Sequence, residues 1–128
     1  MSLLLGKDTE DRLAQAIKLE ESGHLDDSAQ IYRELLRGYP ESWQAHAGLG
    51  RVYYRSKRFR EAAENFEQAL KLKSGDPGIL RWLARSYLRS GESQKLLDLL
   101  GANQKGQENH AWFHLLLARA YDAQDKIA

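Results

Sequence analysis

A pattern of small and aromatic residues recurs along this chain at a fixed interval of 34 residues. Its clearest copy is Ala62, Phe66 and Ala69, in which two small residues flank one aromatic residue on the same face of a helix. Moving back by the interval gives residues of similar order and character: Ser28, Tyr32 and Leu35. A spacing kept without insertion predicts stacked copies of one helical unit, none of which buries its apolar face alone.

A second group of residues keeps the same interval. Its central copy is Leu49, Gly50 and Tyr53, and two later copies hold the register: Leu83, Ala84 and Tyr87, then Leu117, Ala118 and Tyr121. We expect the small residues Gly50 and Ala62 to let the two helices of one unit approach closely, with Phe66 filling the volume between them. The Gly48–Gly50 stretch then reflects close helix packing and not a phosphate loop, because no strand precedes it.

These residues resemble those of the tetratricopeptide repeat family, whose unit is about 34 residues long and consists of two antiparallel helices. Further matches are Tyr32 and Pro40 in the first unit and Gly91 in the third. The resemblance implies an all-α fold, a right-handed α-solenoid of antiparallel helix pairs with about seven helices. It predicts an N-terminal flank at 1–8, three repeats at 9–42, 43–76 and 77–110, and the first helix of a fourth repeat, or a capping helix, at 111–128.

The repeats are not equally regular. In the first repeat, Gln15 replaces the expected leucine. In the third repeat, Asn103 replaces the second small apolar residue, and Gly101 and Gly106 favour an early helix end, since glycine costs about 1 kcal/mol in a helix interior. We therefore predict a short helix near 93–100 and a longer, mobile connection that reaches to about 108.

The C-terminal segment ends after one helix of a pair. Leu115, Leu117, Ala118 and Tyr121 should have a helix against them, because a solenoid normally ends with a polar outer face. Three explanations remain: the chain is a fragment of a longer repeat protein, which we favour; the helix is a self-sufficient cap; or two copies associate through this C-terminal helix as a homo-oligomer.

Composition limits the protein class. The chain has no cysteine, which excludes disulfides and cysteine-based metal sites but leaves the compartment open. No apolar run is long enough to span a membrane, and no export signal is visible. A cytoplasmic location is favoured, and a periplasmic one is open if the chain belongs to an exported protein. Residues 1–42 carry a net charge of −4 and residues 43–128 a net charge of +5, so an acidic partner would be attracted to the later part.

No arrangement of residues indicates catalysis. His110 and His114 are four residues apart, as in metal-binding pairs, but no cysteine is present and no glutamate lies between them. The alternative, which we favour, places His114 in a packing position and His110 in a loop. We therefore predict no enzyme activity, no catalytic residue, no metal site and no cofactor.

By family resemblance, the first helix of each repeat lines a concave groove. The expected ligand-binding residues of this groove are mostly arginines with aromatic residues among them: Arg51, Tyr54, Arg55, Arg81, Arg85, Arg89, Trp112 and Arg119. Trp82 is a further candidate platform. Arginine offers a planar fork for carboxylates and stacks on aromatic rings. The alternative is a solvated face balanced by neighbouring acids such as Glu61, Glu64 or Asp98.

The expected function is a protein–protein interaction scaffold that binds an acidic peptide segment in this groove. The alternative is a regulatory or substrate-docking segment of a larger enzyme or assembly factor. Nucleic acid is a weaker candidate, because the overall charge is +1. Some family members grip the C-terminal carboxylate of chaperones with a Lys/Asn/Lys/Arg set. In this chain the positions of that set in the first repeat are Leu13 and Ile17, so binding of a chaperone C-terminus is disfavoured.

Overall fold

The computed structural model describes residues 2–107 and 109–127. Within them the chain forms seven α-helices and no strand: α1 Ser2–Glu21, α2 Leu25–Gly38, α3 Trp43–Arg55, α4 Phe59–Leu72, α5 Pro77–Ser90, α6 Ser93–Ala102 and α7 Ala111–Ile127. The expected all-α fold of about seven helices is confirmed. Three positions lie outside the described residues: residue 1 of the predicted flank, residue 108 of the predicted connection and residue 128 of the predicted last helix.

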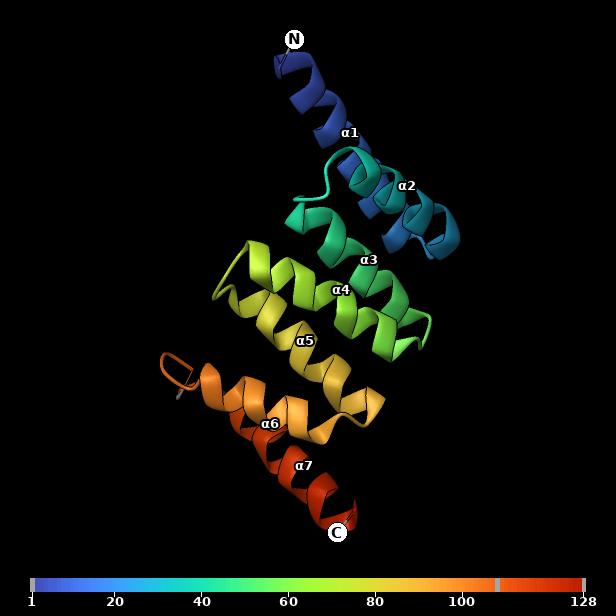
Figure 1. Ribbon diagram of the computed structural model, residues 1–128. Coiled ribbons are helices and arrows are strands. Elements are labelled where there is room, and N and C mark those ends of the chain that lie inside the picture. The colour runs from blue at the N-terminus through green and yellow to red at the C-terminus, as the bar shows by residue number, and fades with distance from the viewer. Residues whose placement is uncertain (1, 108, 128) are drawn as a thin grey trace.

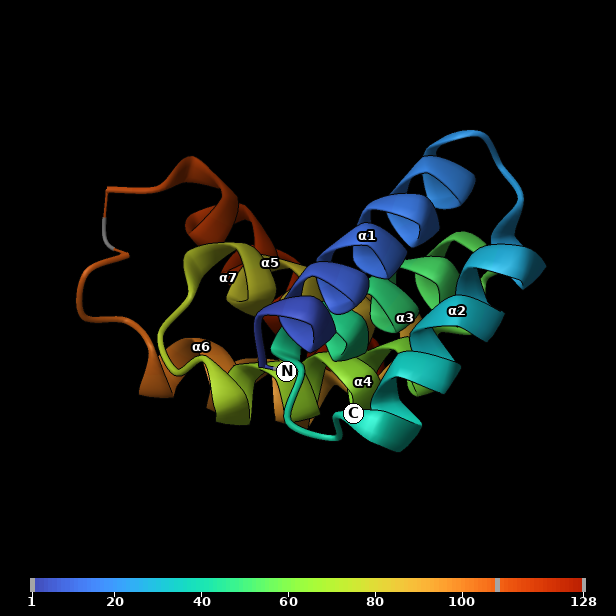
Figure 2. The same cartoon turned by 90° about the horizontal axis from the view of Figure 1, so that it is seen from above.

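The helices form a stack in which successive helices run antiparallel, with the two termini at opposite ends (Figure 1). Each helix contacts the next along the chain, and α1, α3, α5 and α7 also contact one another in series. The described parts of α2, α4 and α6 make no such contacts with one another and lie along the other side of the stack (Figure 2). The layer of odd-numbered helices is therefore the more closely spaced, inner layer, as in a curved solenoid.

Local sequence signals set the start of the inner helices. The Ser42 hydroxyl accepts a hydrogen bond from the Ala45 N–H at 3.2 Å, and the Asp76 carboxylate accepts one from the Ile79 N–H at 2.9 Å. These are standard N-cap interactions, and in α5 the cap precedes a proline at the first helical position. The hydrogen bond from Ile79 lowers the pKa of Asp76, and Lys73 adds to the effect.

Close packing at two glycines of α3 joins this helix to the outer helices on both sides of it. A Cβ atom on Gly50 would lie 2.8 Å from the Phe66 ring, and one on Gly48 would lie 2.2 Å from the Tyr32 ring. Both rings are fully buried. Each glycine thus leaves room for the aromatic ring of one flanking outer helix, Tyr32 in α2 on one side and Phe66 in α4 on the other. The expected close approach at Gly50 is confirmed.

The third repeat departs from the pattern where the sequence indicates. Its second helix, α6, has 10 residues and ends at Ala102. Leu96 and Leu100 take the buried positions and are fully buried. The Asn103 side chain instead donates a hydrogen bond to the Leu99 carbonyl at 2.8 Å. An amide at this position satisfies a carbonyl of the last helical turn, which explains why the helix ends there.

The two ends of the stack differ in polarity. The last helix, α7, buries Phe113, Leu116 and Ala120 but leaves Leu115 53% and Tyr121 58% exposed. At the other end, α1 begins at Ser2, ahead of the predicted repeat boundary, and its Asp11 and Lys18 are exposed. Association of two copies through α7 stays a prediction. None of the helices in the described part of the chain is both long and apolar enough to cross a membrane.

Candidate functional site

A cleft between α5 and α7 holds most of the predicted groove residues. It has a volume of about 300 Å³. Its lining, which we call the arginine cleft, combines four guanidinium groups with aromatic and leucine side chains: Arg81, Arg85, Arg89, Arg119, Tyr54, Trp112, Leu88, Leu115 and Leu116. Six of the eight residues expected to bind a ligand therefore line one concavity.

Two of the four cleft arginines lie against aromatic rings. The Arg81 guanidinium carbon is 5.9 Å from the centroid of the Trp112 ring, and that of Arg89 is 4.6 Å from the Phe59 ring. Such cation–π contacts orient a guanidinium without neutralising its charge. The positive charge of the cleft therefore remains available to a ligand.

No carboxylate among the described residues forms an ion pair with the cleft arginines. Two of the acids that could have balanced them have other contacts, since Glu61 pairs with Arg58 and Asp98 accepts a hydrogen bond from Gln94. Glu64 is exposed on α4, in the outer layer. The contacts thus give no acidic partner among the described residues for the four cleft arginines, although the alternative from the sequence was that neighbouring acids balance them.

Arg51 and Arg55, the other two predicted groove arginines, lie outside the cleft and bind Glu20 of α1. Arg51 donates from Nε and Nη2 to the two carboxylate oxygens of Glu20, at 2.8 and 3.1 Å. Arg55 donates to the Glu20 backbone carbonyl at 2.6 Å. The Tyr32 hydroxyl also donates to the Glu20 carboxylate, at 2.9 Å. Their contacts are therefore those of a structural link between the first two repeats.

Burial governs the electrostatics of this link. The Glu20 residue is only 6% exposed. Burial raises the pKa of the Tyr32 hydroxyl far above its ordinary value, and the adjacent Glu20 carboxylate raises it further. Burial alone would lower the pKa of Arg51, but the bonds to Glu20 outweigh it and the net shift is upward. The Tyr32 hydroxyl and the Arg51 guanidinium therefore both keep their protons around neutral pH. Arg51 and Glu20 form an ion pair to which Tyr32 adds a hydrogen bond.

Trp82, the further candidate platform, is partly buried against the core and does not line the arginine cleft. Its ring stacks on Phe66, with centroids 5.6 Å apart and planes 16° apart, and meets Tyr54 edge-on at 5.3 Å. Tyr54 therefore lines the arginine cleft, and its ring packs edge-on against Trp82. Trp112 of α7 provides the second aromatic wall.

Sequence reasoning missed the partner of Arg51, although the signal was present. Glu20 and Arg51 occupy positions that both face the groove in adjacent repeats, and they carry opposite charges. Side chains that project from neighbouring inner helices on one face can meet across the gap. Testing each groove arginine against the preceding repeat would have found the pair.

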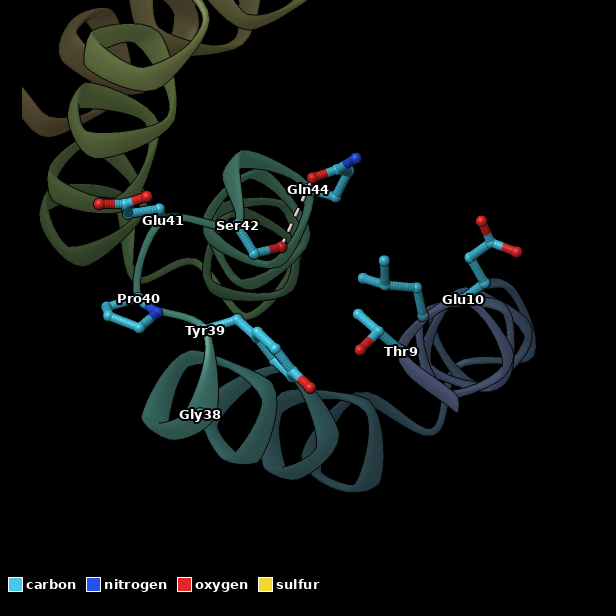
Figure 3. Close-up of a pocket in the computed structure, with 9 residues that line it drawn as sticks. Thr9, Glu10, Gly38, Tyr39, Pro40, Glu41, Ser42 and Gln44 are labelled. Atoms are coloured by element: carbon cyan, nitrogen blue, oxygen red, sulfur yellow. Dashed lines mark hydrogen bonds between the residues drawn. The ribbon is translucent and has the colours of Figure 1, made fainter. Parts of the chain in front are cut away.

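A second hollow lies at the opposite end of the stack, between α1 and the connection from α2 to α3 (Figure 3). Its volume is about 560 Å³, larger than that of the arginine cleft. We call it the N-terminal hollow; its lining residues are Thr9, Glu10, Leu13, Gly38, Tyr39, Pro40, Glu41, Ser42 and Gln44. In the part of the chain that the structure describes, no three His, Cys, Asp or Glu side chains gather closely enough to hold a metal ion.

A family model described as the tetratricopeptide repeat matches residues 13–77 and 52–95. Together these ranges cover more than half of the chain. The chain belongs to the tetratricopeptide repeat family. Proteins of this family are generally non-enzymatic scaffolds for protein–protein interaction.

Individual relatives of this tetratricopeptide repeat protein differ widely in size. It is 36% identical over 61 residues to mouse E3 ubiquitin-protein ligase TTC3, which covers 45% of this chain and 3% of the ligase. The structure of YrrB, described as having an unusual peptide-binding site, superposes with a TM-score of 0.74 at 20% identity, over 83% of this chain and 55% of YrrB.

The TPR2B domain of yeast Sti1, solved as a complex with pHsp70, superposes with a TM-score of 0.71 at 15% identity, over 92% of this chain and 97% of that domain. At these identities, both structural likenesses show the fold.

Proposed function

We propose that this chain is a protein-interaction module whose arginine cleft binds an acidic segment of a partner protein. The observation that carries the proposal is the set of four arginines that line one cleft without a carboxylate partner among the described residues. A row of like charges is unfavourable unless a ligand of opposite charge compensates it. An acidic segment supplies that compensation.

The geometry of the cleft supports a polypeptide as the ligand. Arg81, Arg85 and Arg89 follow one another at intervals of four residues, so they lie in a row along one face of α5. Guanidinium groups bind carboxylates through paired hydrogen bonds. Tyr54, Trp112 and the leucines between the arginines provide apolar surface for the carbon chain of the ligand.

Of two structures similar to this chain, one is described as having a peptide-binding site and the other is a complex with pHsp70. This supports a peptide ligand but says nothing about its sequence.

Binding of defined peptides tests the proposal. The probe is a labelled 12-residue peptide of Glu and Asp with one central Phe, blocked at both ends, and its control carries Lys in place of each acid. We expect fluorescence anisotropy to show weak binding of the acidic peptide only, lost as salt rises. The triple variant Arg81→Ala/Arg85→Ala/Arg89→Ala should bind at least tenfold more weakly.

A matched triple variant removes the same charge elsewhere. Arg37, Arg60 and Lys71 are exposed on the outer helices α2 and α4, so their replacement by Ala should leave the affinity within about twofold. Equal losses in both triple variants would show a non-specific charge effect. Binding of a single-stranded oligonucleotide through the same arginines, without binding of the acidic peptide, would instead point to nucleic acid and overturn the proposal.

A further inference from the structure

The N-terminal hollow has an apolar floor that is open to solvent. In Figure 3 the Tyr39 ring extends from the end of α2 toward Thr9 on α1, and Pro40 lies beside it. Tyr39 is 41% exposed although tyrosine is a large, partly apolar side chain. Leu13, on the same face of α1, completes this floor. Exposed apolar surface in a concave setting is typical of a site that takes an apolar side chain.

The hollow is held in shape by hydrogen bonds of the connecting loop. The Tyr39 N–H donates to the Leu35 carbonyl at 2.7 Å, and the Ser42 N–H donates to the Tyr39 carbonyl at 3.1 Å. The ring of His46 lies 2.9 Å from the Pro40 carbonyl through Nε2. These bonds fix the loop before any ligand arrives, which reduces the entropy lost on binding.

Glu10 and Glu41 lie at opposite edges of the hollow, and Figure 3 shows both carboxylates directed outward from its apolar floor. Glu10 and Glu41 are both exposed, and neither carboxylate forms an ion pair with a described Lys or Arg. Two other glutamates of the first repeat are paired, Glu34 with Arg12 and Glu20 with Arg51. The hollow therefore has charge opposite to that of the arginine cleft.

The repeat register places the hollow and the cleft on the same face of the molecule. Glu10 and Gln44 of the hollow are, respectively, two intervals and one interval of 34 residues before Gly78, and a further interval leads to Trp112 of the cleft. Leu13 corresponds in the same way to Arg81 and Leu115. Equivalent positions on successive inner helices line one continuous concave surface.

We infer that the N-terminal hollow is a second binding site on this surface, for an apolar side chain flanked by Lys or Arg in the same protein ligand whose acidic part occupies the arginine cleft. The inference rests on the proposed function for its second half. The ligand is then a dipolar segment, with a basic, apolar stretch over α1 and an acidic stretch over α5 and α7. Charge complementarity at both ends fixes its direction along the groove.

One extended segment can reach both sites. Two helix-to-helix steps of about 8–10 Å and an offset of about 15 Å along α3 separate them, so the sites lie about 20–25 Å apart. About six to eight residues of extended chain span that distance. A ligand of about 12 to 16 residues can therefore contact both the N-terminal hollow and the arginine cleft.

Three blocked peptides test this inference on the whole chain. The first is acidic, the second carries Leu, Trp, Lys and Arg, and the third joins the two through seven Gly and Ser residues. We expect the joined peptide to bind about tenfold more tightly than the acidic peptide alone, because the second contact is intramolecular. A joined peptide with a two-residue spacer cannot reach both sites and should lose this gain.

Two variants locate the second contact. Glu10→Gln/Glu41→Gln and Tyr39→Ala should each abolish the tenfold gain while leaving the affinity for the acidic peptide unchanged. The matched control Asp11→Asn/Glu64→Gln removes two exposed charges outside the hollow and should keep the gain. Circular dichroism on every variant checks that the helices persist.

The outcomes separate this inference from the proposed function. If the acidic peptide binds but joining the basic peptide adds nothing, or if the gain survives in both hollow variants, the second site is wrong and the cleft stands. If the basic peptide binds and needs Glu10 and Glu41 while the acidic peptide fails, the hollow stands and the arginine cleft falls. Failure of all three peptides overturns both.

Discussion

The second and third repeats carry an arginine at equivalent positions, but the two side chains have different surroundings. Arg51 and Arg85 are 34 residues apart. Arg51 is bound by the Glu20 carboxylate and lies 3.4 Å from the Tyr32 hydroxyl, whereas Arg85 lines an open cleft without an ion-pair partner among the described residues. The same residue type at the same position therefore has an ion-pair partner from the preceding repeat in one case and none among the described residues in the other.

The preceding repeat explains this difference. The residue equivalent to Glu20 one repeat later is Tyr54, and the residue equivalent to Tyr32 is Phe66. The carboxylate and the hydroxyl that hold Arg51 are thus both missing around Arg85. In a solenoid, the role of a groove residue depends on what the neighbouring repeat offers it, and not on its repeat position alone.

The largest effect is expected in the core beneath Arg85. Phe66 is fully buried and stacks on Trp82. Phe66→Ala should lower the free energy of unfolding by about 3–5 kcal/mol, since it removes a core aromatic ring and leaves a cavity. That loss is a large fraction of the stability of a domain of this size. Urea unfolding followed by circular dichroism measures it; a loss below about 1 kcal/mol would contradict the position of the ring.

The link between the first two repeats should show the next largest effect. Glu20→Gln keeps the size of the side chain but removes the charge that neutralises Arg51, which should destabilise the fold by about 2–3 kcal/mol. The figure is below that of a fully buried pair because the Arg51 side chain is 26% exposed. The control Glu21→Gln alters an exposed neighbour and should change stability by less than about 0.5 kcal/mol. Similar losses in the two variants would refute the structural role of Glu20.

Sequence reasoning succeeded where spacing decides the outcome. The 34-residue register predicted the all-α fold and the close approach of Gly50 to Phe66, because a glycine at a crossing is a steric requirement visible in one chain. It also predicted the early end of the third repeat from Gly101 and Asn103, as the hydrogen bond of Asn103 explains.

Pairing across repeats was less visible. Arg51 and Arg85 look alike in the sequence, and their difference arises from side chains of the preceding repeat, which for Arg51 are 31 residues away (Glu20) and 19 residues away (Tyr32). The packing of Trp82 on Phe66 was likewise not visible, because spacing gives the face of a helix but not the ring against which a large side chain packs. The N-terminal hollow was missed since its floor combines Leu13 of a helix with Tyr39 and Pro40 of a loop, which has no periodicity.

Alkaline pH should weaken the link through Tyr32. Burial and Glu20 raise the pKa of Tyr32 above the ordinary value of 10.0, so the folded chain keeps a proton that the unfolded chain loses. The contribution is fully present below pH 10 and is lost as the pH rises, at about 1.4 kcal/mol per pH unit above 10. The Tyr87 hydroxyl donates to the Glu67 carboxylate at 2.7 Å, and burial together with Glu67 raises the pKa of Tyr87 in the same direction.

Urea unfolding at pH 8, 10 and 11 measures this effect. The double variant Tyr32→Phe/Tyr87→Phe should be less stable at pH 8 but should lose less stability between pH 10 and pH 11 than the natural chain. An unchanged slope would mean that these hydroxyls do not retain their protons in the folded state.

The comparison of Arg51 with Arg85 can be tested by transferring the acid. Tyr54→Glu places a carboxylate in the third repeat's cleft at the position equivalent to that of Glu20. We expect it to neutralise Arg85 and to weaken binding of the acidic peptide about tenfold, or about 1.4 kcal/mol. The control Tyr54→Gln introduces a side chain of nearly the same shape as glutamate but without its charge, and it should weaken binding less than Tyr54→Glu. Equal losses would assign the effect to the missing ring.

The smallest effect on stability should come from removing Arg85 itself. Its guanidinium makes no ion pair with a described residue, so Arg85→Ala should change the free energy of unfolding by less than about 0.5 kcal/mol. Arg51→Ala at the equivalent position leaves the buried Glu20 carboxylate without its partner and should cost several times more. If Arg85→Ala proves as destabilising as Arg51→Ala, both arginines are structural. A small stability change together with weaker peptide binding would instead mean that one repeat position serves the fold in the second repeat and the ligand in the third.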